Sequence, residues 1–196
     1  WPELKRTMDP QSGDILIQFK LNIADNSKFN VVPRIWGAGQ QIANLTFWPE
    51  ASPADTNRII MAYNGGQTDV PGSNNLLSGQ WYDVSIEINT DTQKYTAWVG
   101  NKPADVTYYD FISETNVVDT VSYILQGNQN GTVVDPNGIK LDDFKVTRLA
   151  QQSQTDVQWT GSTGVVKTYV DNPDASNKAL QMTLDTSTVG AWPELK

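Results

Sequence analysis

Residues 81–100, WYDVSIEINTDTQKYTAWVG, constrain the fold of this chain more than any other stretch. Apolar residues occupy every second position from Tyr82 to Ile88, and again from Tyr95 to Val99. This period of two is typical of strands with one buried face. The polar residues 89–93 between the two runs favour a turn, because short polar side chains bond their own backbone. Since an isolated hairpin is only marginally stable in water, the sequence predicts a larger sheet around it.

Further short strands, separated by turn residues, follow one another along the chain. The chain has 14 glycines and 10 prolines, and it shows no long helical periodicity. Strands this short, at this spacing, indicate a β-sandwich. We expect residues 1–10 to be irregular. The other expected strands cover residues 14–24, 31–36, 41–48, 58–64, 117–126, 139–149, 165–170 and 179–184.

Three motifs carry a family resemblance. They are GQWYDV at 79–84, KYTAWVGN at 94–101 and LDDFKV at 141–146. The first two resemble the central hairpin of concanavalin A-like, laminin G-like jelly rolls, and the third resembles the strand that usually ends them. The resemblance implies an all-β fold, a two-sheet antiparallel jelly-roll sandwich.

The pentapeptide WPELK occurs twice, as residues 1–5 and again 191 positions further on as residues 192–196. In the jelly rolls named above, strands like those expected at 165–184 lie near the amino end, so the strand order here is rotated. Three explanations are one period of a tandem array, a permuted unit with overlapping ends, and a subunit whose tail completes a neighbour. We favour the array, and the further alternative is a coincidental pentapeptide in two unrelated loops. We expect residues 1–196 to form a single β-sandwich. In it, residues 155–196 supply the early strands to their own body or to a neighbouring subunit, because a segment this short does not bury its own core.

The composition bears on the possible chemistry. Neither cysteine nor histidine is present, which excludes disulfides, thiolate metal sites, cysteine nucleophiles and a histidine base. The net charge of −8 opposes binding to nucleic acid and to anionic membranes. We therefore expect no nucleic-acid partner. No stretch resembles a transmembrane span, so we also expect no membrane insertion.

Enzymes of this fold carry motifs that the chain matches poorly. The closely spaced acids of the glucanases are absent, and Glu87 stands alone on its strand. Residues 2–6, PELKR, and 41–43, QIA, are similar to two strands of alginate lyases, but Ala43 stands where the lyases have histidine. Trp1 likewise replaces an arginine. We therefore expect no catalytic residues, with a polysaccharide lyase as an alternative.

Seven tryptophans favour a binding surface. Aromatic rings stack on the apolar faces of pyranose rings, while planar polar side chains bond the sugar hydroxyls. Alternation places residues 31, 33 and 35, and residues 43, 45 and 47, in the core, and it turns the residues between them outward. The alternative is that these rings cover core edges or subunit contacts. The candidate ligand-binding residues, expected to line one sheet face, are Arg34, Trp36, Asn44, Trp48 and Trp98.

Oxygen-rich side chains gather at residues 171–177 and at Asp142-Asp143. Carbohydrate-binding jelly rolls often hold a structural calcium between such a loop and the last strand, so the resemblance implies calcium here. Calcium accepts several oxygen ligands in loose geometry, whereas the alternative is an Asn/Asp-rich turn without an ion. The expected ligands are Asp142, Asp143, Asp171, Asp174 and Asn177.

We expect a non-catalytic, extracellular or cell-surface module that binds a polysaccharide or another glycan or acts in adhesion. Its further partners are identical neighbouring repeats or subunits of a tandem-repeat surface or filament protein. A purely structural repeat with donor-strand assembly is a second alternative.

Overall fold

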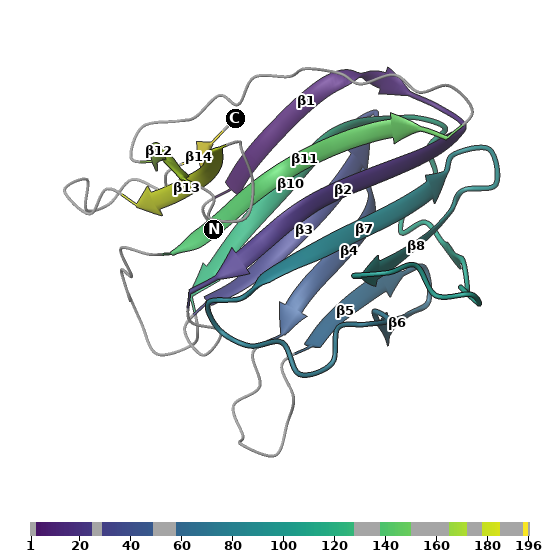
Figure 1. The fold of residues 1–196 in the computed structure, drawn as a ribbon. Helices are drawn as coiled ribbons and strands as arrows, with labels where there is room; N and C mark the ends of the chain where they lie inside the picture. Colours follow the sequence, from purple (N-terminus) through teal and green to yellow (C-terminus); the bar gives the residue numbers. More distant parts are fainter. Residues whose placement is uncertain are drawn as a thin grey trace.

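The chain is built from β-strands (Figure 1). The computed structural model describes residues 3–24, 29–48, 58–127 and 138–149, together with the strand residues 165–171, 178–184 and 194–195. Among these residues there is no helix, and hence none long and apolar enough to cross a membrane. The strands are β1 (Glu3–Gln11), β2 (Asp14–Ile23), β3 (Phe29–Gly37), β4 (Gln40–Trp48), β5 (Arg58–Tyr63), β6 (Gly66–Asp69), β7 (Trp81–Asn89), β8 (Lys94–Val99), β9 (Tyr109–Asp110), β10 (Val118–Gly127), β11 (Ile139–Arg148), β12 (Val165–Asp171), β13 (Lys178–Leu184) and β14 (Glu194–Leu195).

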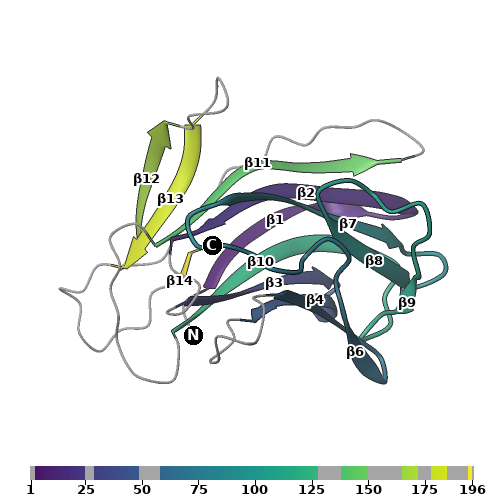
Figure 2. The same ribbon diagram turned by 60° about the horizontal axis from the view of Figure 1, so that its bottom comes forward.

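The strands form two sheets. Sheet A has the order β14-β1-β10-β3-β4-β5-β6, and sheet B has the order β12-β13-β11-β2-β7-β8-β9. Neighbouring strands pair antiparallel, except that β14 runs parallel to β1. Figure 2 shows β11, β2 and β7 of sheet B above β10, β3 and β4 of sheet A. The predicted all-β, two-sheet sandwich is confirmed.

The predicted hairpin at residues 81–100 forms β7 and β8, paired from Val84–Val99 to Asn89–Lys94. It belongs to a larger sheet, because β7 also pairs along its length with β2. Side chains from both sheets pack against each other in the core. Phe19 of β2 meets Tyr123 of β10 edge to face, with ring centroids 5.2 Å apart.

The amino-terminal segment is a strand, so the expectation of an irregular stretch is wrong. The backbone of β1 pairs with β10 from Glu3 to Thr7, and Leu4 lies in the core with 2% of its surface exposed. Pro10 lies where the register shifts between Thr7 and Gln11, and an irregular edge tolerates a residue without an N–H. The proline therefore marks a bulge inside the strand, not the absence of one.

The carboxyl-terminal strands pair with both sheets. The β12–β13 hairpin extends sheet B, because β13 pairs with residues 139–141 of β11. In sheet A, β14 pairs with β1 on the edge opposite β10. The tail thus adds edge strands to two sheets that the residues before 150 already build. The assignment of residues 1–196 to a single sandwich, with strands from 155–196 given to its own body or to a neighbour, stays a prediction.

Candidate functional site

Polar side chains lie in a row on the outer surface of sheet A. The core residues Ile35 and Ala43 face each other across β3 and β4. Their neighbours Arg34 and Asn44 are also directly paired, so they point away from the core, as the alternation predicted. On the other side of β3, Arg34 pairs with Ser122 of β10. We call Arg34, Trp36 and Asn44, together with the fully buried Ser122 beside them, the sheet A face.

Two members of the sheet A face are held in place by hydrogen bonds. The indole Nε1 of the half-buried Trp36 donates to Ser122 Oγ at 2.9 Å, which fixes the ring against β10. The Oδ1 of Asn44 accepts a hydrogen bond from Thr46 Oγ1 at 3.2 Å. The face is therefore partly organised before any ligand arrives. The backbone of Trp48 lies in β4, but its side chain lies outside the described residues.

Two ion pairs lie on the described strands around the sheet A face. Glu3 and Lys5 form an ion pair at 3.0 Å on β1, and Arg58 and Asp69 form one at 3.3 Å on β5 and β6. None of the ion pairs found among the described residues includes Arg34, and its buried Nε lacks a hydrogen-bond partner there. A donor buried without a partner is costly. The Nε–H of Arg34 is thus a donor that the described residues leave without a partner.

Trp98 does not belong to the sheet A face. It lies on β8 in sheet B, and only 5% of its surface is exposed. The Lys102 ammonium covers it, with Nζ 5.2 Å from the ring centroid. A ring this buried offers no face to a sugar, so the expectation that Trp98 joins the other four residues on one sheet face is wrong. For Trp98, the structure therefore agrees better with the alternative of a structural ring.

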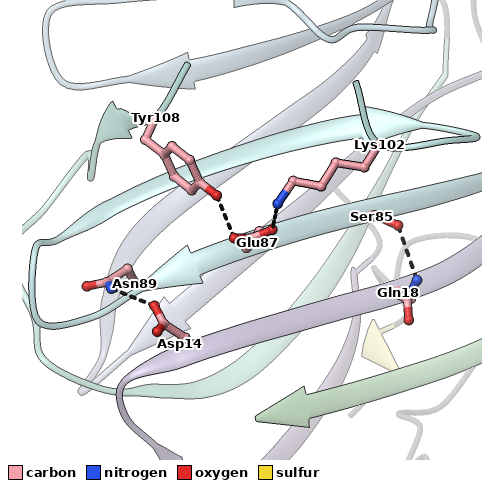
Figure 3. Close-up of polar contacts among 7 residues, drawn as sticks. All are labelled: Asp14, Gln18, Ser85, Glu87, Asn89, Lys102 and Tyr108. Carbon is pink, nitrogen blue, oxygen red and sulfur yellow. Dashed lines mark hydrogen bonds and ion pairs between the residues drawn. The ribbon is translucent and has the colours of Figure 1, made fainter. Parts of the chain in front are cut away.

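The outer surface of sheet B around Glu87 has its polar groups paired with one another (Figure 3). The Glu87 carboxylate accepts hydrogen bonds from Tyr108 Oη and Lys102 Nζ. The bond to Glu87 raises the pKa of Lys102, while burial and then the same carboxylate raise the pKa of Tyr108. Asn89 donates to Asp14 at 2.5 Å, in the same region. We call Glu87, Lys102, Tyr108 and Trp98 the sheet B cluster. The sequence did not predict that these residues meet, because Lys102 and Tyr108 come from a loop.

The predicted calcium ligands are only partly described. Asp143, which has a φ of 49°, forms an ion pair with Lys20 at 2.9 Å. The backbone N–H of Asp143 donates a hydrogen bond to Asp142 Oδ1 at 2.8 Å. The hydrogen bond to Asp143 raises the pKa of Lys20. Within the described ranges no three acidic residues come together as a metal site, and these two carboxylates do not fit calcium by themselves. The side chain of Asp171 and the whole of Asp174 and Asn177 lie outside the described residues.

Comparison with known proteins identifies the fold. No protein-family model matches the chain, and no curated protein matches it either. A solved sialidase superposes with a TM-score of 0.57 at 13% identity, over 75% of this chain and 14% of the sialidase. The fold is a jelly-roll sandwich. The chain spans about a seventh of the sialidase, and at this identity the likeness shows the fold alone.

Other solved structures align over much of their own length. A tetrameric galectin from the ball sponge Cinachyrella sp. has a TM-score of 0.49 and 12% identity, over 74% of this chain and 99% of that one. A heptameric SAP-like pentraxin from Limulus polyphemus has a TM-score of 0.47 and 12% identity, over 76% and 70% of the two chains.

Proposed function

We propose that this chain is a non-catalytic carbohydrate-binding module whose sheet A face holds a polysaccharide or another glycan. The observation that carries the proposal is the guanidinium of Arg34, which lies between Ser122 and Asn44 in the sheet register and outside every described ion pair. A guanidinium donates in a rigid planar fork, which suits sugar hydroxyls and the carboxylates of acidic sugars. Trp36, two residues along β3, supplies an apolar ring beside those donors.

The sheet A face favours binding over hydrolysis. Glycoside hydrolysis requires two carboxyl groups held across the scissile bond. The four residues of the face supply donors, an amide oxygen and an indole ring, but no carboxylate. A ligand held there would be oriented by hydrogen bonds and by stacking, and it would leave unchanged.

The test compares two substitutions that each remove one positive charge. Arg34→Gln changes the sheet A face, whereas Lys145→Gln changes an exposed lysine on β11 of sheet B. Neutral and acidic polysaccharides are first screened on a glycan array, and the affinity for the best ligand is then measured by calorimetry. Since a hydrogen bond to a charged group contributes about 1.5–3 kcal/mol, we expect Arg34→Gln to weaken binding about tenfold or more. Lys145→Gln should bind like the unmodified chain.

Equal affinity of the two variants would move the binding surface away from Arg34. If no glycan binds at all, the module is a structural repeat instead. Trp36→Ala gives a second variant on the same face, and circular dichroism checks that each variant keeps its fold.

We also propose that the module is extracellular or at the cell surface, as one unit of a tandem-repeat adhesive or filament protein. The recurrence of WPELK after 191 positions supports the tandem-repeat part of this proposal. The test is the gene sequence on either side of the region that encodes this chain. A second copy of the module there supports the repeat, and unrelated sequence on both sides contradicts it.

A structural calcium remains part of the proposal, with Asp142 or Asp143 joined by ligands from residues 171–177. An ion that binds only the folded state stabilises it by about 1.4 kcal/mol when its concentration is tenfold above the dissociation constant. The melting temperature should therefore rise with added calcium and fall again with a chelator. An unchanged melting temperature would remove calcium from the proposal.

A further inference from the structure

Residues 3–4 and 194–195, which belong to the two WPELK copies, lie side by side in sheet A. Glu3 and Leu4 of the first copy pair with Ile124 and Tyr123 of β10. On the opposite edge of β1, the second copy runs parallel and in register with the first, with Glu194 beside Glu3 and Leu195 beside Leu4. One sequence thus occupies two adjacent strand positions, an inner one against β10 and an outer one at the sheet edge (Figure 1).

The inner position is selective for the sequence that fills it. Leu4 is 2% exposed and packs among the core residues between the sheets. Glu3 and Lys5, on the outer surface, form an ion pair at 3.0 Å. An identical pentapeptide that runs in the same direction makes the same backbone ladder, core contact and ion pair. The inner position therefore accepts either copy equally well.

The outer position is a poor one for the second copy. Its described pairing comprises two residues of a parallel ladder, and parallel pairing is slightly less stable per residue than antiparallel pairing. β14 is also the last strand of sheet A, so among the described strands it pairs on one side alone. The second copy gains stability whenever it moves from the edge into an inner position.

We propose that residues 192–196 of one chain enter the inner position beside β10 in a second copy of the chain and displace its residues 1–5. An exposed sheet edge is a site where another strand adds. Here the donor segment and the acceptor position are different surfaces of the molecule, so the contact is head-to-tail and leads to open chains of subunits. This inference extends the proposed repeat organisation. The two proposals share one observation, which is that the two pentapeptides are identical. The inference does not require a ligand on the sheet A face, although Lys5 pairs with Ser122 of that face.

The first experiment asks whether the copies replace each other, using full-length variants. In Leu4→Asp only the second copy can fill the core site, and in Leu195→Asp only the first can. We expect each single variant to melt within a few degrees of the unmodified chain. In the double variant neither copy can place a leucine in the core site, so the melting temperature should fall by on the order of 10 °C. If Leu4→Asp falls as far as the double variant, the copies are not interchangeable and the proposal is wrong.

The second experiment asks whether the exchange joins two chains. Light scattering of the unmodified chain should show a mass that rises with concentration above the 21.7 kDa of one chain, whereas Leu195→Asp should stay at that mass. Leu149→Asp is the matched control, because Leu149 is 48% exposed at the end of β11, and it should associate like the unmodified chain. A constant single-chain mass for the unmodified protein would overturn exchange between copies, even if Leu4→Asp melts normally. Glycan affinity measured on Leu195→Asp tests the proposed glycan binding separately, because the four residues of the sheet A face are unchanged in this variant.

Discussion

The outer surfaces of the two sheets carry similar residues that are used in opposite ways. Each surface has a tryptophan beside a cationic side chain, Trp36 with Arg34 on sheet A and Trp98 with Lys102 on sheet B. In the sheet B cluster the cation pairs with Glu87 and covers the ring, whereas Arg34 takes part in no described ion pair. Where the protein pairs its own polar groups, a ligand gains little by displacing them. The contrast supports the proposal that a ligand binds to the sheet A face.

The largest expected effect concerns the two tryptophans. Trp98→Ala removes a ring that is 5% exposed and should lower the free energy of unfolding by about 3–5 kcal/mol. Trp36→Ala removes a half-buried ring and one hydrogen bond, so the loss should be about 1–2 kcal/mol. Urea unfolding of both variants measures the difference. If the two losses are equal, Trp36 is a structural ring and the contrast between the faces disappears.

The sequence predicted which side chains of a strand point outward better than it predicted which sheet holds the strand. Alternation correctly turned Arg34 and Asn44 outward, because it depends only on the neighbours in one strand. The error with Trp98 has a different origin. Its strand pairs with β7, which pairs with β2, and the strand therefore lies in the sheet opposite Arg34. Such pairing depends on contacts far apart in the sequence, and no local period encodes it.

The same limit applies to the loops and the termini. Lys102 and Tyr108 reach Glu87 from a segment without periodicity, so their cluster left no signal in the sequence. The second WPELK copy was visible as a repeat, but its place beside β1 depends on how sheet A is ordered. Composition and alternation thus predict the sandwich and one face, while the arrangement of the strands decides which residues share a site.

An intermediate effect is expected from Glu87→Gln, which breaks the pairing in the sheet B cluster. The carboxylate accepts two hydrogen bonds, but the Lys102 side chain is 42% exposed, so solvent screening limits the loss to about 1 kcal/mol. The pair with Glu87 raises the pKa of Lys102 above its ordinary value of 10.5. Its contribution is therefore complete below that pH and is lost as the pH rises through the raised pKa.

Unfolding measured at several pH values checks this prediction. The stability difference between the unmodified chain and Glu87→Gln should persist from neutral pH to about 10 and shrink above it. Glu114→Gln, which removes the same charge from an exposed loop position, serves as the control and should show no such difference. If the stability difference stays constant up to the most alkaline pH, Glu87 stabilises the fold through packing and not through its ion pair with Lys102.

The smallest effect on stability is expected from Arg34→Gln. The substitution removes a guanidinium that takes part in no described ion pair and whose buried Nε lacks a partner, while glutamine keeps part of the apolar stem against the sheet. No ion pair found among the described residues is lost, so the free energy of unfolding should change by no more than about 0.5 kcal/mol. Urea unfolding beside Glu87→Gln gives the comparison directly, because each variant replaces one charged side chain on the outer surface of a sheet. A loss above about 1 kcal/mol for Arg34→Gln would mean that the folded protein already uses the guanidinium. Arg34 would then be no freer for a ligand than Lys102 is.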